Sequence, residues 1–241
     1  MGTTPPSIED LAAVMDADSE TSLLDQVRKL AVSLGFDYFM LGVEVTQPLL
    51  RPTHHVSSGY PLRWQRIYQE REFLRKDPTV THCQQNTTPL IWSEQLYGET
   101  SRDLWEEARA YGISHGVSIP VHDRSGTKSM FSLARDKPLE FGALTPSHAL
   151  AGARLLANSA HYAMSKIIVP DLIKRRTPNI TTRERECLLW SAKGKTAAEV
   201  GLILKISEAT AVFHLNNVVR KLNVANRMQA VALGVSMGLV Y

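Results

Sequence analysis

Four helix starts follow one another at short intervals near the end of the chain, and they constrain its fold more than any other feature. Thr181, Thr196, Ser207 and Asn226 are residue types that cap helix N-termini, and each stands before a segment with helical spacing of apolar residues. Thr181 and Thr196 are each followed three residues later by glutamate, the pattern of a capping box. The sequence therefore predicts a small domain of four short helices.

The second and third predicted helices are joined by a short connection, Lys205-Ile206-Ser207. Two short helices that meet across so tight a connection are typical of a helix-turn-helix. The third helix, over 208–222, has one apolar face, which we expect in the core of the small domain. The residues of that face are Ala211, Leu215, Val218 and Leu222.

The opposite face of this helix would meet base edges if the helix entered the major groove of DNA. It carries Val212, Phe213, Asn216, Asn217 and Arg220. Side chains near helix ends are candidates for holding phosphates and fixing the register on DNA, namely Lys195, Thr196, Lys221 and Arg227. The alternative is a small four-helix domain that binds protein.

The distribution of charge favours a polyanionic partner for this domain. Residues 178–241 hold eight basic and four acidic side chains, whereas residues 1–168 hold 16 basic and 19 acidic ones. A small basic segment after a larger acidic body is a modest indication of nucleic-acid binding.

The body of the chain alternates helical and strand patterns. Helical spacing occurs in SIEDLAAVMDA, ETSLLDQVRKLAVSLG, PLRWQRIYQER, PTVTHCQQN and SRDLWEEARAYG. Strand patterns occur in FDYFMLGVEV, HHVSS and PLIWS, and a hairpin is predicted for HGVSIPVHD and KSMFSLARD. A long helix is expected from Thr145, as its N-cap, to about Ile168. Prolines and a basic cluster then predict a linker over 169–179.

Several aromatic residues surround one carboxylate in the body. Trp64 and Tyr68 are four residues apart and share one face of a helix that starts at Pro61. Large aromatic residues with polar tips suit a closed apolar cavity with a few well-placed donors. Equally, these residues fit an ordinary core, with Asp77 only the cap of a helix that begins at Pro78. The full set is Tyr60, Trp64, Tyr68, Asp77, Trp92 and Trp105.

The run TRERECLLWSAKGKTAAEVGLILKISEATAVFHLNNVVRKLNVANRMQAVALG resembles the DNA-binding domain of the LuxR family, and the similarity covers essentially all of residues 178–241. The resemblance implies that this domain binds DNA, with Thr210 among the matched positions. Many family members have Val and then Lys or Arg after this threonine, whereas this chain has Ala211 and Val212. Val212 can touch a thymine methyl group but cannot donate to guanine, so we expect an altered site preference or a greater dependence on phosphate contacts.

The segments YPLRWQRIY, DPTV, PLIW, HGVSIPV and FSLARD resemble, in order and spacing, the LuxR-type autoinducer-binding domain over roughly residues 5–165. The family's ligands are N-acyl-homoserine lactones. The resemblance implies that Trp64 donates its indole N–H to the lactone carbonyl and that Asp77 accepts from the amide N–H. It also implies that Tyr68 and Ser132 hold the acyl carbonyl through their hydroxyl groups.

Further positions follow from the same resemblance. Trp92 and Trp105 would pack on the lactone ring, Tyr60 and Thr79 match positions that contribute in some members, and Gly116 matches a glycine that allows close packing. A ligand so enclosed would become part of the core, contributing about 0.8 kcal/mol per buried methylene. We therefore expect the sensor domain to be loose or poorly soluble without ligand.

The resemblance implies an α+β sensor domain over 1–168, an α/β/α sandwich on a five-stranded antiparallel sheet. A linker over 169–179 and an all-α helix-turn-helix domain of four helices over 180–241 would follow. Two readers on a two-fold symmetric promoter site imply a homodimer, formed through the long helix 145–168 and the last helix. RNA polymerase is a further expected partner.

Other classes of function lack residues to carry them. The chain has no glycine-rich phosphate loop and no nucleophile elbow, so no enzyme and no cofactor are expected. Neither His54-His55 nor His82-Cys83 has further ligands at useful spacing, so no metal site is expected. No apolar run is long enough for a membrane span, no secretory leader is recognised, and both cysteines are expected to be reduced in a cytoplasmic protein.

The sequence thus predicts a quorum-sensing transcription regulator that binds an acyl-homoserine lactone and a promoter site. One alternative is a protein of the same fold that ignores ligand or answers a non-lactone signal. A second is a protein-binding adaptor that has lost DNA binding, which the uncharged Val212 keeps open. Acyl length, 3-oxo preference, the choice between activation and repression, and target genes are not determined by the sequence.

Overall fold

The computed structural model describes residues 5–46, 52–138, 146–176 and 179–241. The chain forms two compact units. One contains the described residues up to Val45 and Thr53–Asp171, and the other contains the described residues of Leu172–Tyr241. Among the described residues, none of the helices combines the length and the apolar character that a bilayer crossing requires.

The first unit is built on a five-stranded antiparallel sheet with the order β2-β1-β5-β4-β3. Its strands are β1 (Tyr38–Val45), β2 (Thr53–Ser58), β3 (Leu90–Ile91), β4 (His115–His122) and β5 (Thr127–Arg135). Residues alternate along β1, where Phe39, Leu41 and Val43 are buried on one face. The α/β/α sandwich and its five-stranded sheet, predicted from the resemblance, are confirmed.

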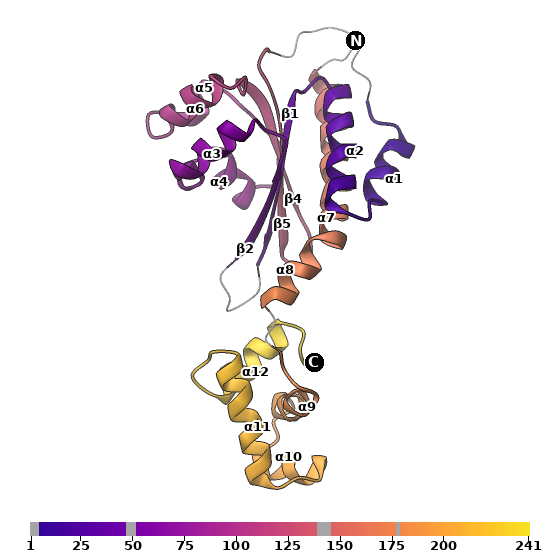
Figure 1. Cartoon of the computed structure of the whole chain (residues 1–241), viewed down its shortest axis with the longest axis vertical. Coiled ribbons are helices and arrows are strands. Elements are labelled where there is room, and N and C mark those ends of the chain that lie inside the picture. The colour runs from indigo at the N-terminus through magenta and orange to yellow at the C-terminus, as the bar shows by residue number, and fades with distance from the viewer. Residues whose placement is uncertain (1–4, 47–51, 139–145, 177–178) are drawn as a thin grey trace. The chain divides into compact units, whose positions relative to one another are not determined.

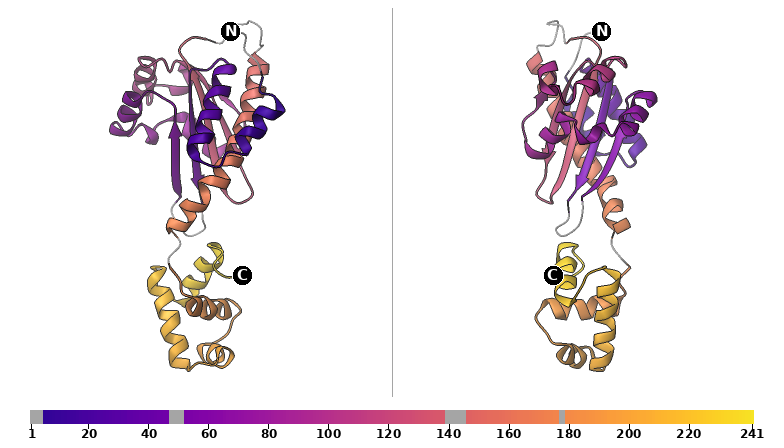
Figure 2. Two further views of the ribbon diagram at one scale, coloured as in Figure 1. Left: turned by 45° about the vertical axis from the view of Figure 1, so that its right-hand side comes forward. Right: turned by 90° about the vertical axis from the view of Figure 1, so that its left-hand side faces the viewer.

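Helices cover both faces of the sheet (Figures 1 and 2). On one face lie α1 (Ile8–Met15), α2 (Glu20–Ser33) and α7 (Pro146–Ile167). On the other face lie α3 (Leu62–Glu70), the 3-10 turn η1 (Phe73–Arg75), α4 (Pro78–Gln85), α5 (Glu94–Tyr97) and α6 (Arg102–Arg109). The short elements η1 and α5 were not predicted, because a single turn carries no helical period.

The second unit consists of α9 (Thr182–Ala192), α10 (Ala197–Leu204), α11 (Glu208–Lys221) and α12 (Arg227–Ser236). All four predicted caps are confirmed, since the side chains of Thr181, Thr196, Ser207 and Asn226 each accept from a backbone N–H in the first turn. Both capping boxes are complete. The predicted apolar face of α11 packs into the core through Ala211, Leu215, Val218 and Leu222.

The segment predicted to be a linker, residues 169–179, contains a helix. Residues Val169–Arg176 form α8. Pro170 does not prevent this, because it stands in the first turn, where a missing N–H leaves no helical hydrogen bond unmade. The expected N-cap Thr145 of α7 lies outside the described residues.

Candidate functional site

The register of the sheet sets out three cross-strand rows on the face that is covered by α3 and α4. Because side chains alternate between faces, every second residue of each strand belongs to this face. The first row is Ser58, Met40, Ser132 and Ser118, which is mainly hydroxyl-bearing. The second row, Val56, Gly42, Met130 and Pro120, is apolar. The third row, His54, Glu44, Lys128 and His122, is charged or ionisable.

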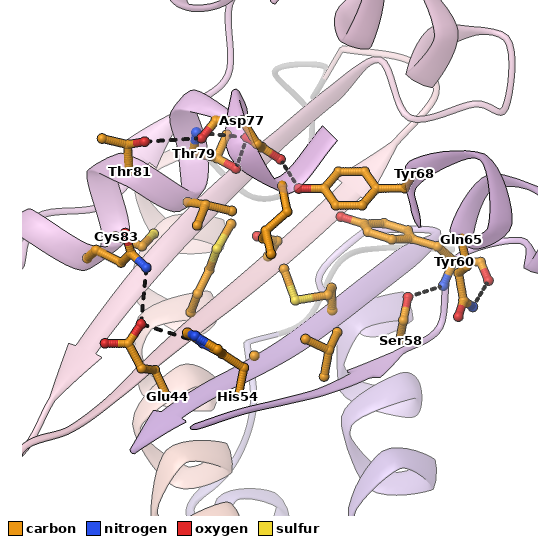
Figure 3. Close-up of a pocket in the computed structure, with 18 of the residues that line it drawn as sticks. Glu44, His54, Ser58, Tyr60, Gln65, Tyr68, Asp77, Thr79, Thr81 and Cys83 are labelled. Atoms are coloured by element: carbon orange, nitrogen blue, oxygen red, sulfur yellow. Dashed lines mark hydrogen bonds and ion pairs between the residues drawn. The ribbon is translucent and has the colours of Figure 1, made fainter. Parts of the chain in front are cut away.

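A cavity of about 680 Å³ lies over these rows, within the range of small-molecule sites. Its remaining walls come from α3 and α4 and from the segments that hold Trp92 and Tyr97. The lining includes seven of the eight residues predicted to bind ligand, which are Tyr60, Trp64, Tyr68, Asp77, Thr79, Trp92 and Ser132. The structure thus brings these predicted residues to one cavity. Tyr60, Tyr68, Asp77 and Thr79 are labelled in Figure 3.

Asp77 is buried at one end of this cavity, and its carboxylate accepts three hydrogen bonds. Its Oδ1 accepts from the Thr79 backbone N–H at 2.9 Å and from the Thr79 hydroxyl at 2.6 Å. Its Oδ2 accepts from the Tyr68 hydroxyl at 2.8 Å. Burial raises the pKa of Asp77 above its ordinary value, while the hydrogen bonds from Thr79 and Tyr68 lower the pKa. The three donors fix the position of the carboxylate, and the adjoining cavity leaves space for a further donor from a ligand.

Asp77 fits both interpretations made from the sequence, a helix cap and a residue of a ligand-binding cavity. Asp77 is the N-cap of α4, with Pro78 in the first helical turn, as the ordinary reading expects. It also lines the cavity, as the binding reading expects. The cap fixes the carboxylate rigidly, so the local structure that makes it an ordinary helix start also aims it at the cavity.

Aromatic side chains hold the wall opposite the sheet. Trp64 and Tyr68 share one face of α3, as predicted, with ring centroids 5.8 Å apart in an edge-to-face arrangement. Phe73 of η1 packs against both rings. Burial and the nearby Asp77 raise the pKa of Tyr68 well above its usual value, so its hydroxyl stays protonated and remains a donor.

Trp92, Ser118 and Ser132 form a hydrogen-bonded chain, in which the two serines are buried. The indole Nε1 of Trp92 donates to the Ser118 hydroxyl at 2.9 Å. The Ser118 hydroxyl lies 2.8 Å from that of Ser132. Ser118 was missed from the sequence, although the predicted hairpin pairs it with Ser132 and period-two alternation puts it on the same face as Gly116.

Trp105 does not line this cavity. It is buried behind Tyr97, with ring centroids 4.8 Å apart, and Tyr97 itself lines the cavity. Tyr97, the last residue of the short helix α5, thus lines the cavity where Trp105 does not. Gly116 faces Trp92, and a Cβ there would lie 2.6 Å from a Trp92 ring carbon, so the glycine does permit the close packing expected of it.

A second site is formed by α10 and α11. Lys205 adopts a left-handed conformation between them, and a Cβ at Gly201 would come within 2.9 Å of the Ile206 carbonyl oxygen. This close approach fixes the two helices against each other, as a helix-turn-helix requires. On the outer face of α11, Val212 is 40% exposed and Phe213 61% exposed. Arg220 on the same face donates to the Asn217 side chain at 3.1 Å.

The expected phosphate-binding residues have partners within the domain. Lys221 donates to the buried Glu184 carboxylate at 2.7 Å and to the Asn179 carbonyl at 2.9 Å. Lys195 lies 3.1 Å from Glu199, and Arg227 donates to the Lys195 carbonyl. Thr196 is occupied in its capping box. Lys221 therefore has a structural role within the domain.

Two family models match the chain. The model described as "Autoinducer binding domain" matches residues 19–164, and the model described as "Bacterial regulatory proteins, luxR family" matches residues 178–233. Together they cover the cavity and the helix-turn-helix.

Similar proteins are found along nearly the whole chain. "Transcriptional activator protein SolR" of Ralstonia nicotianae is 37% identical, over 93% of this chain and 94% of that protein. "HTH-type quorum-sensing regulator RhlR" of Pseudomonas aeruginosa is 30% identical, over 96% of this chain and 93% of that protein. Among solved structures, "SdiA in complex with octanoyl-rac-glycerol" has a TM-score of 0.73 at 27% identity and covers 96% of this chain and 94% of that one.

Proposed function

The chain belongs to the luxR family of bacterial regulatory proteins and carries that family's autoinducer-binding domain, and we propose that its signal is an N-acyl-homoserine lactone. It is a transcription regulator that binds DNA through its helix-turn-helix, and not an enzyme. The proposal concerns which small molecule enters the cavity and which residues hold it.

The observation that carries the proposal is the placement of Asp77. A buried carboxylate that faces a hollow calls for a donor from the ligand, and a secondary amide N–H supplies one. Trp64 would donate to the lactone carbonyl, and Tyr60 and Thr79 would frame the head group. Trp92 and Tyr97 would pack on the lactone ring, with Trp105 supporting Tyr97 from behind.

The acyl carbonyl requires a donor, and we assign that role to Ser132 alone. The hydroxyl proton of Tyr68 is directed at Asp77, so in this arrangement it is not available to a carbonyl oxygen. Tyr68 would instead hold Asp77 in place. This assignment differs from the expectation that both hydroxyl groups hold the carbonyl.

The helix-turn-helix domain would bind DNA together with the same domain of a second copy of the chain. A homodimer would place two α11 helices on a two-fold symmetric site in the cytoplasm, with Val212, Phe213, Asn216, Asn217 and Arg220 toward base edges and Lys195, Thr196, Thr210, Lys221 and Arg227 near the backbone. Relatives named as transcriptional activators support activation. RNA polymerase is the further partner that we propose for an activator. An electrophoretic mobility shift at two salt concentrations tests DNA binding, since phosphate contacts weaken steeply with salt.

A second candidate signal is a non-lactone acyl compound. The solved structure of SdiA with octanoyl-rac-glycerol shows that a protein similar to this one holds an acyl glycerol. Mass spectrometry of ligand extracted from protein expressed with a mixture of acyl lactones and acyl glycerols separates the two. Recovery of a lactone supports the proposal, and recovery of only glycerol esters supports the alternative.

A further inference from the structure

The C-terminal half of α4 is joined to the third row of the sheet by three polar links. The Gln84 side chain donates to the Glu44 carboxylate at 3.0 Å, and Lys128 Nζ donates to the Gln84 carbonyl at 2.8 Å. His122 Nε2 lies 2.7 Å from the Cys83 carbonyl oxygen. We call these links the seam. His54 lies beside the seam, with its Nδ1 3.5 Å from Glu44 (Figure 3).

The seam lies at the opposite end of the cavity from Asp77. Asp77 begins α4 and Gln84 stands in its last turn, so the helix spans the hollow from head to far end. Along the same direction, the face of the sheet that lines the cavity carries the hydroxyl groups of the first row, the apolar second row, and the third row with Glu44 and Lys128. The apolar part of the cavity, which we call the slot, therefore has polar groups at both of its ends.

We propose that the seam is the end wall of the acyl slot and that Glu44 and Gln84 set the longest acyl chain that the protein accepts. The proposal rests on the proposed function, because it takes an acyl lactone as the occupant. It concerns a different part of the ligand from the head group that Asp77 holds.

Two lengths in the structure agree on the size of the slot. From the first row to the third, four residues along β5 cover about 13 Å. From Asp77 to Gln84, seven residues of α4 rise about 10 Å. With C–C bonds of about 1.5 Å at near-tetrahedral angles, an extended alkyl chain advances about 1.25 Å per carbon. The slot therefore accommodates acyl chains of up to about eight to ten carbons.

A longer chain would meet Glu44, whose side chain is only 14% exposed. Its methyl end would have to break the hydrogen bond between Gln84 and the carboxylate and lie against a charged group. Each extra methylene below the limit improves affinity about fourfold, and this gain stops at the seam.

The test is a series of saturated N-acyl-homoserine lactones, from butanoyl to tetradecanoyl, titrated against the full-length protein. Thermal unfolding gives the stabilisation by each lactone for the wild type and for Glu44→Ala, Gln84→Ala and Glu44→Gln. Glu44→Gln keeps the size of the side chain and a hydrogen bond to Gln84. Glu70→Ala, on an exposed position of α3 away from the cavity, is the matched control. Melting of each ligand-free variant shows that it is folded.

We expect affinity in the wild type to rise to eight to ten carbons and then fall. In Glu44→Ala and Gln84→Ala the optimum moves by at least two carbons, and the dodecanoyl lactone gains about tenfold or more relative to the octanoyl one. Glu44→Gln and Glu70→Ala keep the wild-type optimum. An unchanged optimum in both alanine variants overturns the proposal and means that long tails leave past the exposed Val56 and Leu74. If no lactone of any length stabilises the wild type, the proposed function fails as well.

Discussion

The hydroxyl groups of Ser118 and Ser132 lie 2.8 Å apart, buried on adjacent strands of the sheet. The Trp92 indole can only donate, so Ser118 accepts from it. Either hydroxyl can donate in the Ser118–Ser132 hydrogen bond, and we infer the order in which Ser118 is the donor. In that order the proton of Ser132 is left for the cavity. This order of donors makes Ser132 suited to a carbonyl oxygen.

Ser118→Ala is expected to weaken lactone binding about threefold to tenfold, although Ser118 is not itself among the cavity-lining residues. The reason is that Ser132 loses the partner that orients its proton. Calorimetric titration of the wild type, Ser118→Ala, Ser132→Ala and the double variant measures the coupling. Strictly additive losses would show that Ser118 does not act through Ser132, and Ser114→Ala serves as the matched control.

The pKa of Asp77 predicts how the ligand-free protein responds to pH. A raised pKa means that the folded state binds a proton that the unfolded chain has already released, so this contribution to stability is present below the ordinary value of 3.8 and is lost as pH rises through the higher folded pKa. Asp77→Asn removes the titration and retains a good N-cap. Its melting temperature should therefore rise relative to that of the wild type as the pH is raised from 3.8 towards neutrality. A constant difference over that range would contradict the assignment.

Lys221→Met is expected to destabilise the helix-turn-helix domain by about 1–3 kcal/mol, because it leaves the Glu184 carboxylate buried without its charged donor. Chemical denaturation followed by the fluorescence of Trp190 of α9 measures the loss. Glu184→Gln in the Lys221→Met background should restore part of it. A variant that unfolds like the wild type and binds DNA more weakly would assign Lys221 to phosphate contact alone.

Val212→Lys is expected to change which DNA sequence is preferred, since residue 212 lies on the exposed face of α11 and lysine can donate to guanine. Competition binding over variants of the target site measures preference directly. An identical order of site preference in both proteins would place residue 212 away from the bases. A uniform gain at every site, with a steeper dependence on salt, would indicate a phosphate contact instead.

Local signals were sufficient for much of this fold. The caps at Thr181 and Thr196 and the spacing in α11 depend on residues within one or two turns, so the sequence predicts them without tertiary information. The positions of Trp64 and Asp77 followed from a helix face and a helix start, and the resemblance supplied their roles.

The parts that were missed depend on contacts between distant segments. Tyr97 reaches the cavity because a single helical turn inserts before α6, and such a turn has no pattern to detect. The seam joins Gln84 to Glu44, 40 residues away, which only the packing of α4 on the sheet determines. For the same reason the ion pair between Lys221 and Glu184 could not be separated from a phosphate contact by sequence alone.

The most direct test of the ligand site compares an N-acyl-homoserine lactone with the matching ester, in which oxygen replaces the amide N–H. Titration of the full-length protein with octanoyl forms of both compounds gives their relative affinity. If Asp77 accepts from the amide, the wild type should prefer the lactone amide by about tenfold to a hundredfold, and Asp77→Ala should lose that preference. Equal affinity of the wild type for both compounds, or an unchanged preference in Asp77→Ala, would contradict the assignment of Asp77 as the residue that recognises the signal.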